Sequence, residues 1–418
     1  MAAVFGCARE PTAGAMRPFP RPYSAMLAVC SDIDGATPEE FEQYHSFLNS
    51  TEGGEMGMGL GLDIADSFWM YMANGSKDSV DKEGRAFSAT MTYFFRTGPE
   101  YKNASMIKYY MENGWIDSMH SFGDFSSQDE KTTVFTRELA EAAAAELSPR
   151  GLWPTVWINH GNASNVQNLR RGGGFLADYR QGGKPDSDYY HADLTIPGGI
   201  KFVWFSDPSS DFGADSPLYP AELEDGRKIW GFRRYTGERE GLFGHRYNWS
   251  IYNLEEQLSK KHLDGIAEKG GFAVVAQHLG GAKEYVPLLE PGREAFSRLA
   301  EYQRDGKILV ARTSRLLEYA RVRDNLDYEY YSGENESIDI RAVDDPQLGR
   351  DGNPGISSLR GMTFYVRDAS RAAILINGVP VSEDELVRTS GEEMNTVGIR
   401  WFEPDTRNFA HGGAFLYH

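Results

Sequence analysis

The chain has 418 residues, with 43 Lys and Arg against 61 Asp and Glu, so its formal net charge at pH 7 is −18. A chain this acidic, without a clustered basic patch, repels phosphate backbones, and we expect no nucleic-acid partner. Hydrophobic residues make up 40% of the composition and aromatic residues 13%. That content is enough for a large core and excludes wholesale disorder.

Cysteine usage and hydropathy narrow the class of protein further. Only Cys7 and Cys30 are present, which excludes a disulfide framework and a cysteine-based zinc site. No apolar run reaches about 18 residues, so no membrane-spanning helix is expected. Residues 1–22 form a Pro-rich lead-in without the pattern of a secretion signal. We therefore expect a cytoplasmic protein, and the sequence gives no indication of its oligomeric state.

Strand-like and helix-like segments alternate between residues 23 and 325. Thr37, followed by Pro38 and two glutamates, is a helix start signal. Six or more strand–helix units predict an α/β fold, a (β/α) barrel of eight or seven strands. The expected strands are 24–30, 59–63, 87–95, 116–119, 153–158, 200–205, 272–276 and 307–311. The expected helices begin at Thr37 and then cover 106–113 (ended by Gly114), 136–147, 254–270, 294–305 and 315–323.

The pattern changes after residue 325. Short strands are expected at 328–331, 337–343, 362–367, 372–376 and 396–402, separated by turn signals such as Asn377-Gly378. Residues 326–418 are therefore predicted to form a small all-β, sandwich-like domain. Two further segments, 172–190 and 206–220, are expected to be loops over one face of the barrel.

Polar residues follow several of the predicted strands directly. They are Asp32 and Asp34 after the first strand, His120 and Asp124 after 116–119, His160 after 153–158 and His278 after 272–276. Each one alone is typical of a helix cap or a structural residue. Because the carboxyl ends of barrel strands meet at one face, we expect the set to converge there.

Carboxylates and imidazoles are the ligands that Zn²⁺ and similar divalent ions prefer when no cysteine is available. A hydrolytic site would take Asp34, His120 and either Asp124 or His160 as ligands to the ion. Asp32 would then act as general base, and His278 would give a proton to the leaving group. The set predicts metal-assisted hydrolysis of an amide or ester.

The same residues resemble a known family, the polysaccharide deacetylases of carbohydrate esterase family four. Cys30–Gly35 (CSDIDG) stands where the family has Thr-Phe-Asp-Asp-Gly, with one residue inserted between the two acids. His120–Asp124 (HSFGD) is similar to the family motif His-Ser/Thr-x-x-His. Ala276-Gln277-His278 resembles the Leu-x-His pattern, and 308–319 resembles the closing strand and helix. The resemblance covers about residues 25–325 and places the chain in a divergent branch.

This resemblance implies a metal-dependent enzyme that removes acetyl groups from an N-acetylated sugar, as in surface-polysaccharide assembly. Asp32 would be the base, Asp34 and His120 metal ligands, and His278 the acid. The inserted Ile33 leaves open an exchange of roles between the two acids. Asp124 stands where the family has a ligand histidine, and His160 is the alternative. The family's Arg-Pro motif is expected near His160, and its arginine is absent there.

Aromatic residues near strand ends suit a carbohydrate ligand, because apolar sugar faces stack on aromatic rings. We expect Trp157 and Asn162, on either side of His160, to contact the sugar. Other candidates for stacking are Trp69, Trp115, Trp153, Trp204 and Trp249.

Two other functions fit the same sequence. A glycoside hydrolase would use paired carboxylates about 5–10 Å apart and no metal, with Asp32 and either Asp124 or Glu240 in those roles. A non-catalytic carbohydrate-binding protein would explain the departures from the family motifs.

Overall fold

A computed structural model describes residues 12–73, 86–125, 134–161, 165–172, 179–240, 244–245, 247–281, 288–391 and 394–410. The chain forms two compact units, neither of which is continuous in sequence. One combines Met1–Ser24 with Glu318–Glu403, and the other combines Ala25–Leu317 with Pro404–His418. None of the helices in the described ranges combines the length and the apolar character needed to cross a bilayer.

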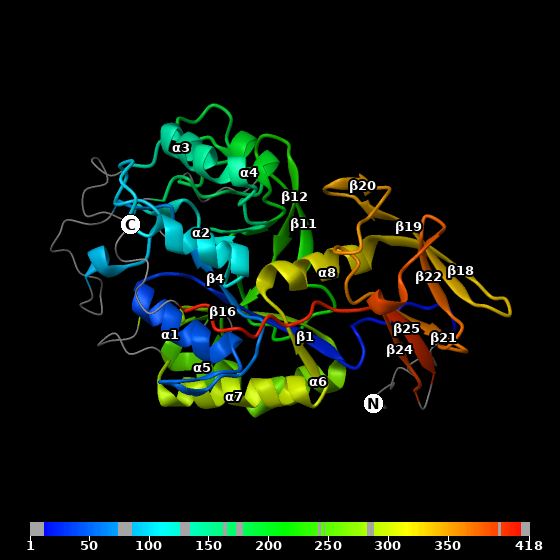
Figure 1. The fold of residues 1–418 in the computed structure, drawn as a ribbon. Helices are drawn as coiled ribbons and strands as arrows, with labels where there is room; N and C mark the ends of the chain where they lie inside the picture. Colours follow the sequence, from blue (N-terminus) through cyan, green and yellow to red (C-terminus); the bar gives the residue numbers. More distant parts are fainter. Residues whose placement is uncertain are drawn as a thin grey trace. The chain divides into compact units, whose positions relative to one another are not determined.

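The larger unit is built on an 11-stranded sheet, whose path runs β10-β13-β16-β1-β4-β6-β8-β9-β12-β11, with β17 also paired to β1. All of its pairings are parallel except β11 with β12. The strands are β1 (Ala25–Ser31), β4 (Ala65–Phe68), β6 (Ile116–Met119), β8 (Val156–Ile158), β9 (Phe202–Trp204), β10 (Pro208–Ser209), β11 (Leu218–Glu222), β12 (Lys228–Phe232), β13 (Arg234–Tyr235), β16 (Gly271–Gln277) and β17 (Ile308–Val310) (Figure 1).

The predicted (β/α) barrel of seven or eight strands is wrong. The sheet has two edges, β10 and β11, and these strands do not pair with each other in the described residues. One stretch of chain carries both β12, which pairs with β9, and β13, which meets β16 at the single pair Tyr235↔Val275. Arg233 separates β12 from β13. Alternation along a sequence predicts the number of strand–helix units. It does not predict whether the first and last strands pair and so close the sheet into a barrel.

Eight α-helices are present in the described residues. α1 begins as predicted, because Thr37 and Glu40 form a capping box in which each side chain accepts the other's backbone N–H. Gly114 ends α2 in the left-handed conformation at φ 80°, as predicted. Helices α5 and α6 both pack against α7, and α6 also packs against β16 (Figure 1). The helices are α1 (Pro38–Asn49), α2 (Ala104–Asn113), α3 (Arg137–Leu147), α4 (Ala192–Gly198), α5 (Leu254–Gln257), α6 (Lys260–Lys269), α7 (Glu290–Arg304) and α8 (Thr313–Asn325).

Several predicted elements are corrected by the structure. The strand expected at 59–63 is absent, and β4 begins only at Ala65. Asp63, just before this strand, forms ion pairs with Arg312 and Arg315. Residues 87–95 contain a 3-10 turn at Phe87–Ala89 and no strand. The long helix expected over 254–270 is broken after α5, because Ser259 caps a new helix, α6. The expected loop at 206–220 contains β10 and the start of β11.

The smaller unit contains two antiparallel-rich sheets. One consists of β18 (Leu326–Tyr331), β19 (Ser337–Asp345), β20 (Gly349–Asp351), β22 (Ala373–Ile376) and β23 (Val379–Pro380), and the other of β21 (Thr363–Val366), β24 (Leu386–Thr389) and β25 (Asn395–Ile399). The predicted turn at Asn377-Gly378 joins β22 to β23 with φ of 49° and 77°, as tight hairpins require. The ring of Tyr328 packs 4.9 Å from that of Phe364, which links the two sheets. The lead-in residue Gly14 joins this unit through its N–H, which donates to the Tyr365 carbonyl at 2.7 Å.

A buried carboxyl group, Asp66, lies on β4 within the larger unit. Tyr44 donates its hydroxyl to Asp66 Oδ2 at 2.6 Å, and the Ser67 N–H donates to Oδ1 at 2.8 Å. The nearest imidazole, His45, is itself fully buried, and its Nε2 lies 4.0 Å from Asp66. Burial raises the pKa of Asp66 to about 7 and lowers the pKa of His45 to about 3. Both groups are therefore favoured in their neutral forms within the fold.

Asp66 should make the stability of the chain depend on pH. Its pKa in the fold exceeds the value of about 3.9 for an unfolded Asp, so its contribution is fully present below about pH 4. That contribution is lost as pH rises through about 7, at a cost of up to about 4 kcal/mol. Asp66→Asn should therefore flatten the fall in unfolding free energy between pH 5 and pH 8, measured by urea denaturation. The exposed control Asp186→Asn should keep the wild-type slope, and equal slopes in Asp66→Asn and wild type would contradict the assignment.

Candidate functional site

The large sheet brings the predicted polar residues to one edge. Asp32 and Asp34 follow β1, His120 follows β6, His160 follows β8 after Asn159, and His278 follows β16. Because β16, β1, β4, β6 and β8 are successive neighbours in a parallel arrangement, their carboxyl ends lie side by side.

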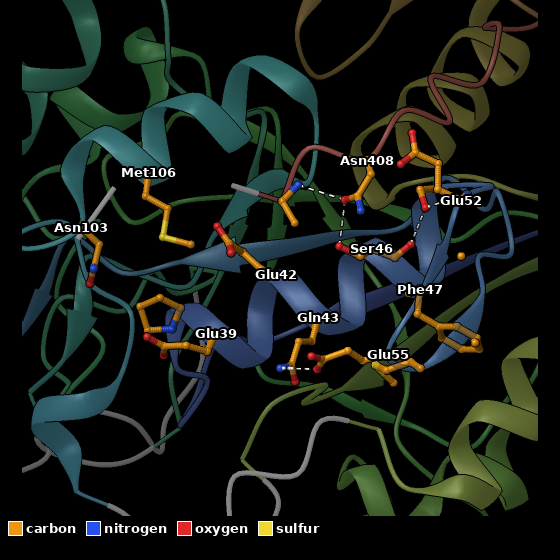
Figure 2. A pocket seen from close by; sticks show the side chains of 17 residues that line it. Glu39, Glu42, Gln43, Ser46, Phe47, Glu52, Glu55, Asn103, Met106 and Asn408 are labelled. Carbon is orange, nitrogen blue, oxygen red and sulfur yellow. Dashed lines mark hydrogen bonds between the residues drawn. The ribbon is translucent and has the colours of Figure 1, made fainter. Parts of the chain in front are cut away.

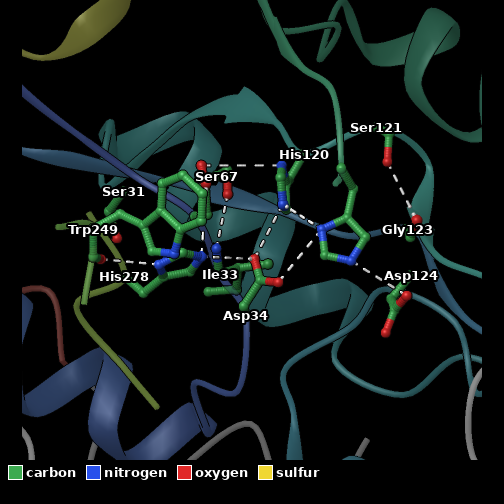
Figure 3. Close-up of polar contacts among 12 residues, drawn as sticks. Ser31, Ile33, Asp34, Ser67, His120, Ser121, Gly123, Asp124, Trp249 and His278 are labelled. Atoms are coloured by element: carbon green, nitrogen blue, oxygen red, sulfur yellow. Dashed lines mark hydrogen bonds and ion pairs between the residues drawn. The ribbon is translucent and has the colours of Figure 1, made fainter. Parts of the chain in front are cut away.

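Three of these residues, Asp34, His120 and His160, form a compact group that could hold a metal ion. Figure 3 shows the side chains of Asp34 and His120 in this group. His120 Nε2 lies 2.8 Å from His160 Nδ1 and 3.1 Å from Asp34 Oδ2. His160 Nδ1 lies 3.4 Å from Asp34 Oδ1. Two imidazole nitrogens and one carboxylate therefore point at a common centre.

The donor set fits a tetrahedral zinc-like ion. Ligand distances of about 2.0–2.2 Å place neighbouring donors of a tetrahedral site about 3.3–3.5 Å apart, close to the 2.8–3.4 Å separations in this group. Asp34 Oδ2 is buried and has no hydrogen-bond partner among the described residues. Three protein ligands leave the fourth position to water or substrate, as catalytic zinc sites require.

Asp124 lies behind the metal-ligating group and outside it. Its Oδ1 is 3.3 Å from His160 Nε2, the ring nitrogen opposite to the one that faces Asp34 and His120. A carboxylate in that position fixes the orientation and tautomer of a ligand histidine. Of the two predicted alternatives for the third ligand, the geometry favours His160, and Asp124 supports it.

The inserted Ile33 is accommodated by the core. Its side chain is fully buried, and its N–H donates to Ser67 Oγ at 2.9 Å. The two acids on either side of it reach different partners: Asp34 joins the histidines, and Asp32 Oδ2 accepts a hydrogen bond from Arg234 at 3.0 Å. This separation favours Asp34 as the ligand and Asp32 as the base over the exchanged roles.

Arg234 is a site residue that the sequence analysis missed. Its side chain is only 1% exposed, it also donates to the Cys30 carbonyl at 2.9 Å, and its guanidinium stacks 4.4 Å from the centre of the Trp204 ring. The family resemblance predicts an arginine in the loop near His160, whereas Arg234 comes from β13. The available signal was the Arg233-Arg234 pair that follows the apolar run of β12, whose residues Ile229–Phe232 are buried.

A second group of possible ligands, Asp32, Asp34 and His278, shares Asp34 with the first. His278 Nε2 lies 3.8 Å from Asp32 Oδ2 and 3.7 Å from Asp34 Oδ2. A cation placed there would meet the fixed positive charge of Arg234 on Asp32, while no arginine or lysine pairs with Asp34 in the described residues. Electrostatics therefore favour the group of Asp34, His120 and His160 as the metal site.

The ring of His278 is fixed by one backbone carbonyl. Nδ1 lies 3.0 Å from the Trp249 oxygen, which also accepts the His278 backbone N–H at 2.9 Å. A carbonyl oxygen only accepts hydrogen bonds, so Nδ1 carries the proton. Nε2 is therefore the nitrogen that faces Asp32, Asp34 and the cavity.

The acids and imidazoles perturb each other's protonation. Burial by itself raises the pKa of Asp34, but the neighbouring His120 and His160 outweigh it and hold that pKa well below its usual range. Burial lowers the pKa of His160, but the carboxylates of Asp34 and Asp124 outweigh it and raise that pKa to about 9. The group is thus a tightly held ion pair, which is typical of functional sites.

A cavity of about 350 Å³ opens onto these side chains and is walled by Trp69, Trp204 and Trp249. The Trp69 ring stacks on His120 at 5.8 Å. The prediction that Trp157 contacts the sugar is wrong, because this ring is fully buried and its N–H donates to Asn159 Oδ1. The predicted contact Asn162 lies outside the described residues. Trp115 and Trp153 are buried and do not line the cavity either.

A second cavity, of about 470 Å³, lies between α1, α2 and the hairpin of β2 (Gly53–Gly54) and β3 (Gly57–Met58) (Figure 2). It is lined by the carboxylates of Glu39, Glu42, Glu52 and Glu55 together with Met56 and Met106. No histidine lines it, and it includes none of the predicted site residues.

Comparisons with known proteins leave the site to be interpreted from its own geometry. No protein-family model matches this sequence, and no curated protein matches it. Among solved structures, the chain is similar to a bacterial fucosidase crystallised with a monovalent iminocyclitol inhibitor, at 11% sequence identity. The alignment covers 94% of this chain and 97% of that chain, with a TM-score of 0.29. A likeness this weak carries no argument about fold or function.

Metal binding should separate the ligands from the supporting carboxylate. We expect wild-type chain to bind about one Zn²⁺, and Asp34→Ala to lose this binding, in calorimetric titration of metal-stripped protein. Asp124→Asn should keep the stoichiometry and weaken affinity roughly 10–100-fold, because it removes the negative charge behind His160 without removing a ligand. Asp186→Asn serves as a control with wild-type affinity. Complete loss of the site in Asp124→Asn would show that Asp124 is itself a ligand.

The Asp32–Arg234 pair should be coupled in stability. Arg234→Gln leaves the buried carboxylate of Asp32 without its cation and should lower the unfolding free energy by roughly 3–5 kcal/mol. In the double variant Asp32→Asn with Arg234→Gln, much of this loss should be recovered, because no buried charge remains unpaired. Additive losses in a double-mutant cycle would contradict a direct interaction.

Proposed function

We propose that this protein is a metal-dependent hydrolase that removes acetyl groups from an N-acetylated sugar. The observation that carries the proposal is the convergence of His120, His160 and Asp34 within 3.4 Å of one another, beside a carboxylate held by Arg234. We propose zinc as the ion, because two imidazoles and one carboxylate with an open position suit it. When bound, such an ion acidifies a water molecule and polarises a carbonyl group.

Asp32 is positioned to act as the general base. Arg234 occupies its Oδ2, whereas Oδ1 is buried without a hydrogen-bond partner among the described residues. Oδ1 also lies 4.0 Å from His120 Nδ1, beside the proposed metal ligands, and we assign it the proton of the attacking water. The guanidinium stops the carboxylate from rotating, so that the acceptor oxygen stays in place.

His278 is positioned to act as the acid. With Nδ1–H held by the Trp249 carbonyl, its imidazolium form carries the transferable proton on Nε2. The carboxylates of Asp32 and Asp34 lie 3.8 and 3.7 Å from that nitrogen. Delivery of this proton to the departing amine nitrogen completes the cleavage of the amide bond.

Acetate release from N,N′-diacetylchitobiose tests the proposal directly. We expect release by the zinc-loaded chain, its loss in excess chelator and its recovery when zinc is restored. Asp32→Asn and His278→Ala should each lower kcat by about 10²–10⁴-fold, the usual contribution of a general base or acid. Both variants should keep zinc stoichiometry, which distinguishes lost proton transfer from lost metal. Asp186→Asn should keep the wild-type rate.

The same reactions discriminate between the remaining hypotheses. Release of reducing sugar without acetate, unchanged by chelator, would assign the glycoside hydrolase chemistry in its place. Sugar binding with no product of either kind after long incubation would assign a non-catalytic carbohydrate-binding protein. Either result would overturn the deacetylase proposal.

A further inference from the structure

A polar cavity of about 600 Å³ lies in the larger unit and includes none of the proposed catalytic residues. Its lining includes Arg171, Asp207, Ser209, Asp211, Tyr219 and Arg233, and we call it the arginine cavity. Two guanidinium groups, hydroxyl groups and an aromatic ring line this one cavity.

Both guanidinium groups are held against one tyrosine. Arg171 lies 5.2 Å and Arg233 5.0 Å from the centre of the Tyr219 ring, so two like charges are kept close together by cation–π contacts. Arg171 also pairs with Asp207 at 2.8 Å, whereas no carboxylate of the described residues pairs with Arg233. The cavity therefore contains one cation that has no counter-charge within the described chain.

The arginine cavity shares a wall with the site cavity. Trp204 lines the site cavity, and its indole N–H donates to the backbone carbonyl of Asp207, which lines the arginine cavity. The neighbouring residues Arg233 and Arg234 line the arginine cavity and the site cavity respectively. The two cavities are therefore adjacent, with Trp204, Asp207 and the Arg233-Arg234 pair between them.

We propose that the arginine cavity binds an anionic substituent, a carboxylate or a phosphate, on a sugar unit next to the one that reacts. This inference rests on the proposed function and names its substrate class: an acidic N-acetylated glycan. A guanidinium binds either anion through two parallel hydrogen bonds. The Ser209 hydroxyl lies in the same lining and offers a further donor.

The carboxylates of the cavity set the number of anionic groups that it accepts. Arg171 and Asp207 are 49% and 40% exposed, so solvent screens their pair and an incoming anion exchanges with Asp207 readily. Asp207 already pairs with Arg171, so Arg233 alone is left for an anion, and a dense polyanion would meet the carboxylates of Asp207 and Asp211. The cavity thus selects a ligand with one isolated acidic group. The protein's net charge of −18 would in addition repel a ligand that carries many negative charges.

Calorimetric binding of three matched disaccharides tests this. The probes are N-acetylglucosamine linked to glucose, to glucuronate or to glucose 6-phosphate, titrated into the full chain at low salt. We expect at least one charged probe to bind about tenfold more tightly than the neutral one, and this preference to shrink as salt rises. Arg233→Gln and Arg171→Gln should each bring the ratio towards one. Arg304→Gln, an exposed arginine at the end of α7, should keep the wild-type ratio.

Each outcome of the titration decides something. Preference for glucuronate assigns a carboxylate ligand, and preference for the phosphorylated probe assigns a phosphate ligand. Equal binding of all three probes, or a preference that survives both arginine variants, would overturn the inference. Binding is measured without turnover, so acetate release with no charge preference would refute the arginine cavity alone. A charge preference with no acetate release would refute the deacetylase and leave the anion site in place.

Discussion

The parallel pairing of β1 with its neighbours is the constraint on which the site depends. Ser31 is in register with Gln277 of β16 and with Asp66 of β4, so the residues that leave β1 emerge between two other strand ends. Asp32, Asp34 and His278 therefore meet without a long loop to bring them together. The hydrogen bonds of the sheet fix the positions of the backbones, so the side chains of these residues span only a short distance to reach one another.

Charge is balanced locally at this edge of the sheet. Three aspartates, Asp32, Asp34 and Asp124, face three histidines and one arginine. They share some of these partners, because His160 lies near both Asp34 and Asp124, and His278 lies near both Asp32 and Asp34. Arg234 pairs with Asp32, Asp34 faces the three histidines, and Asp124 lies at the outer nitrogen of His160. The three carboxylates therefore have different surroundings, which is the condition for acids that are close in space to take separate roles.

Much of this could be predicted from sequence, because strand ends and helix caps are local properties. The positions of β1, β6 and β16 and the start of α1 at Thr37 follow from hydrophobic runs and capping residues, and with them the edge at which the polar residues gather. The open sheet could not be predicted, because closure depends on long-range pairing of two-residue strands such as β13. The burial of Trp157 and the pairing of Arg234 with Asp32 depend equally on tertiary contacts that no spacing encodes.

The Asp32–Arg234 contact joins residues 202 positions apart in the chain. Its two members come from the first strand of the larger unit and from a short strand beyond the midpoint of the sequence. During synthesis, the carboxylate would be present long before its guanidinium, so any earlier burial of Asp32 would leave an uncompensated charge. Burial of Asp32 consequently belongs to the late stages of folding, and a shortened chain that lacks β13 would keep the histidines but leave Asp32 without its arginine.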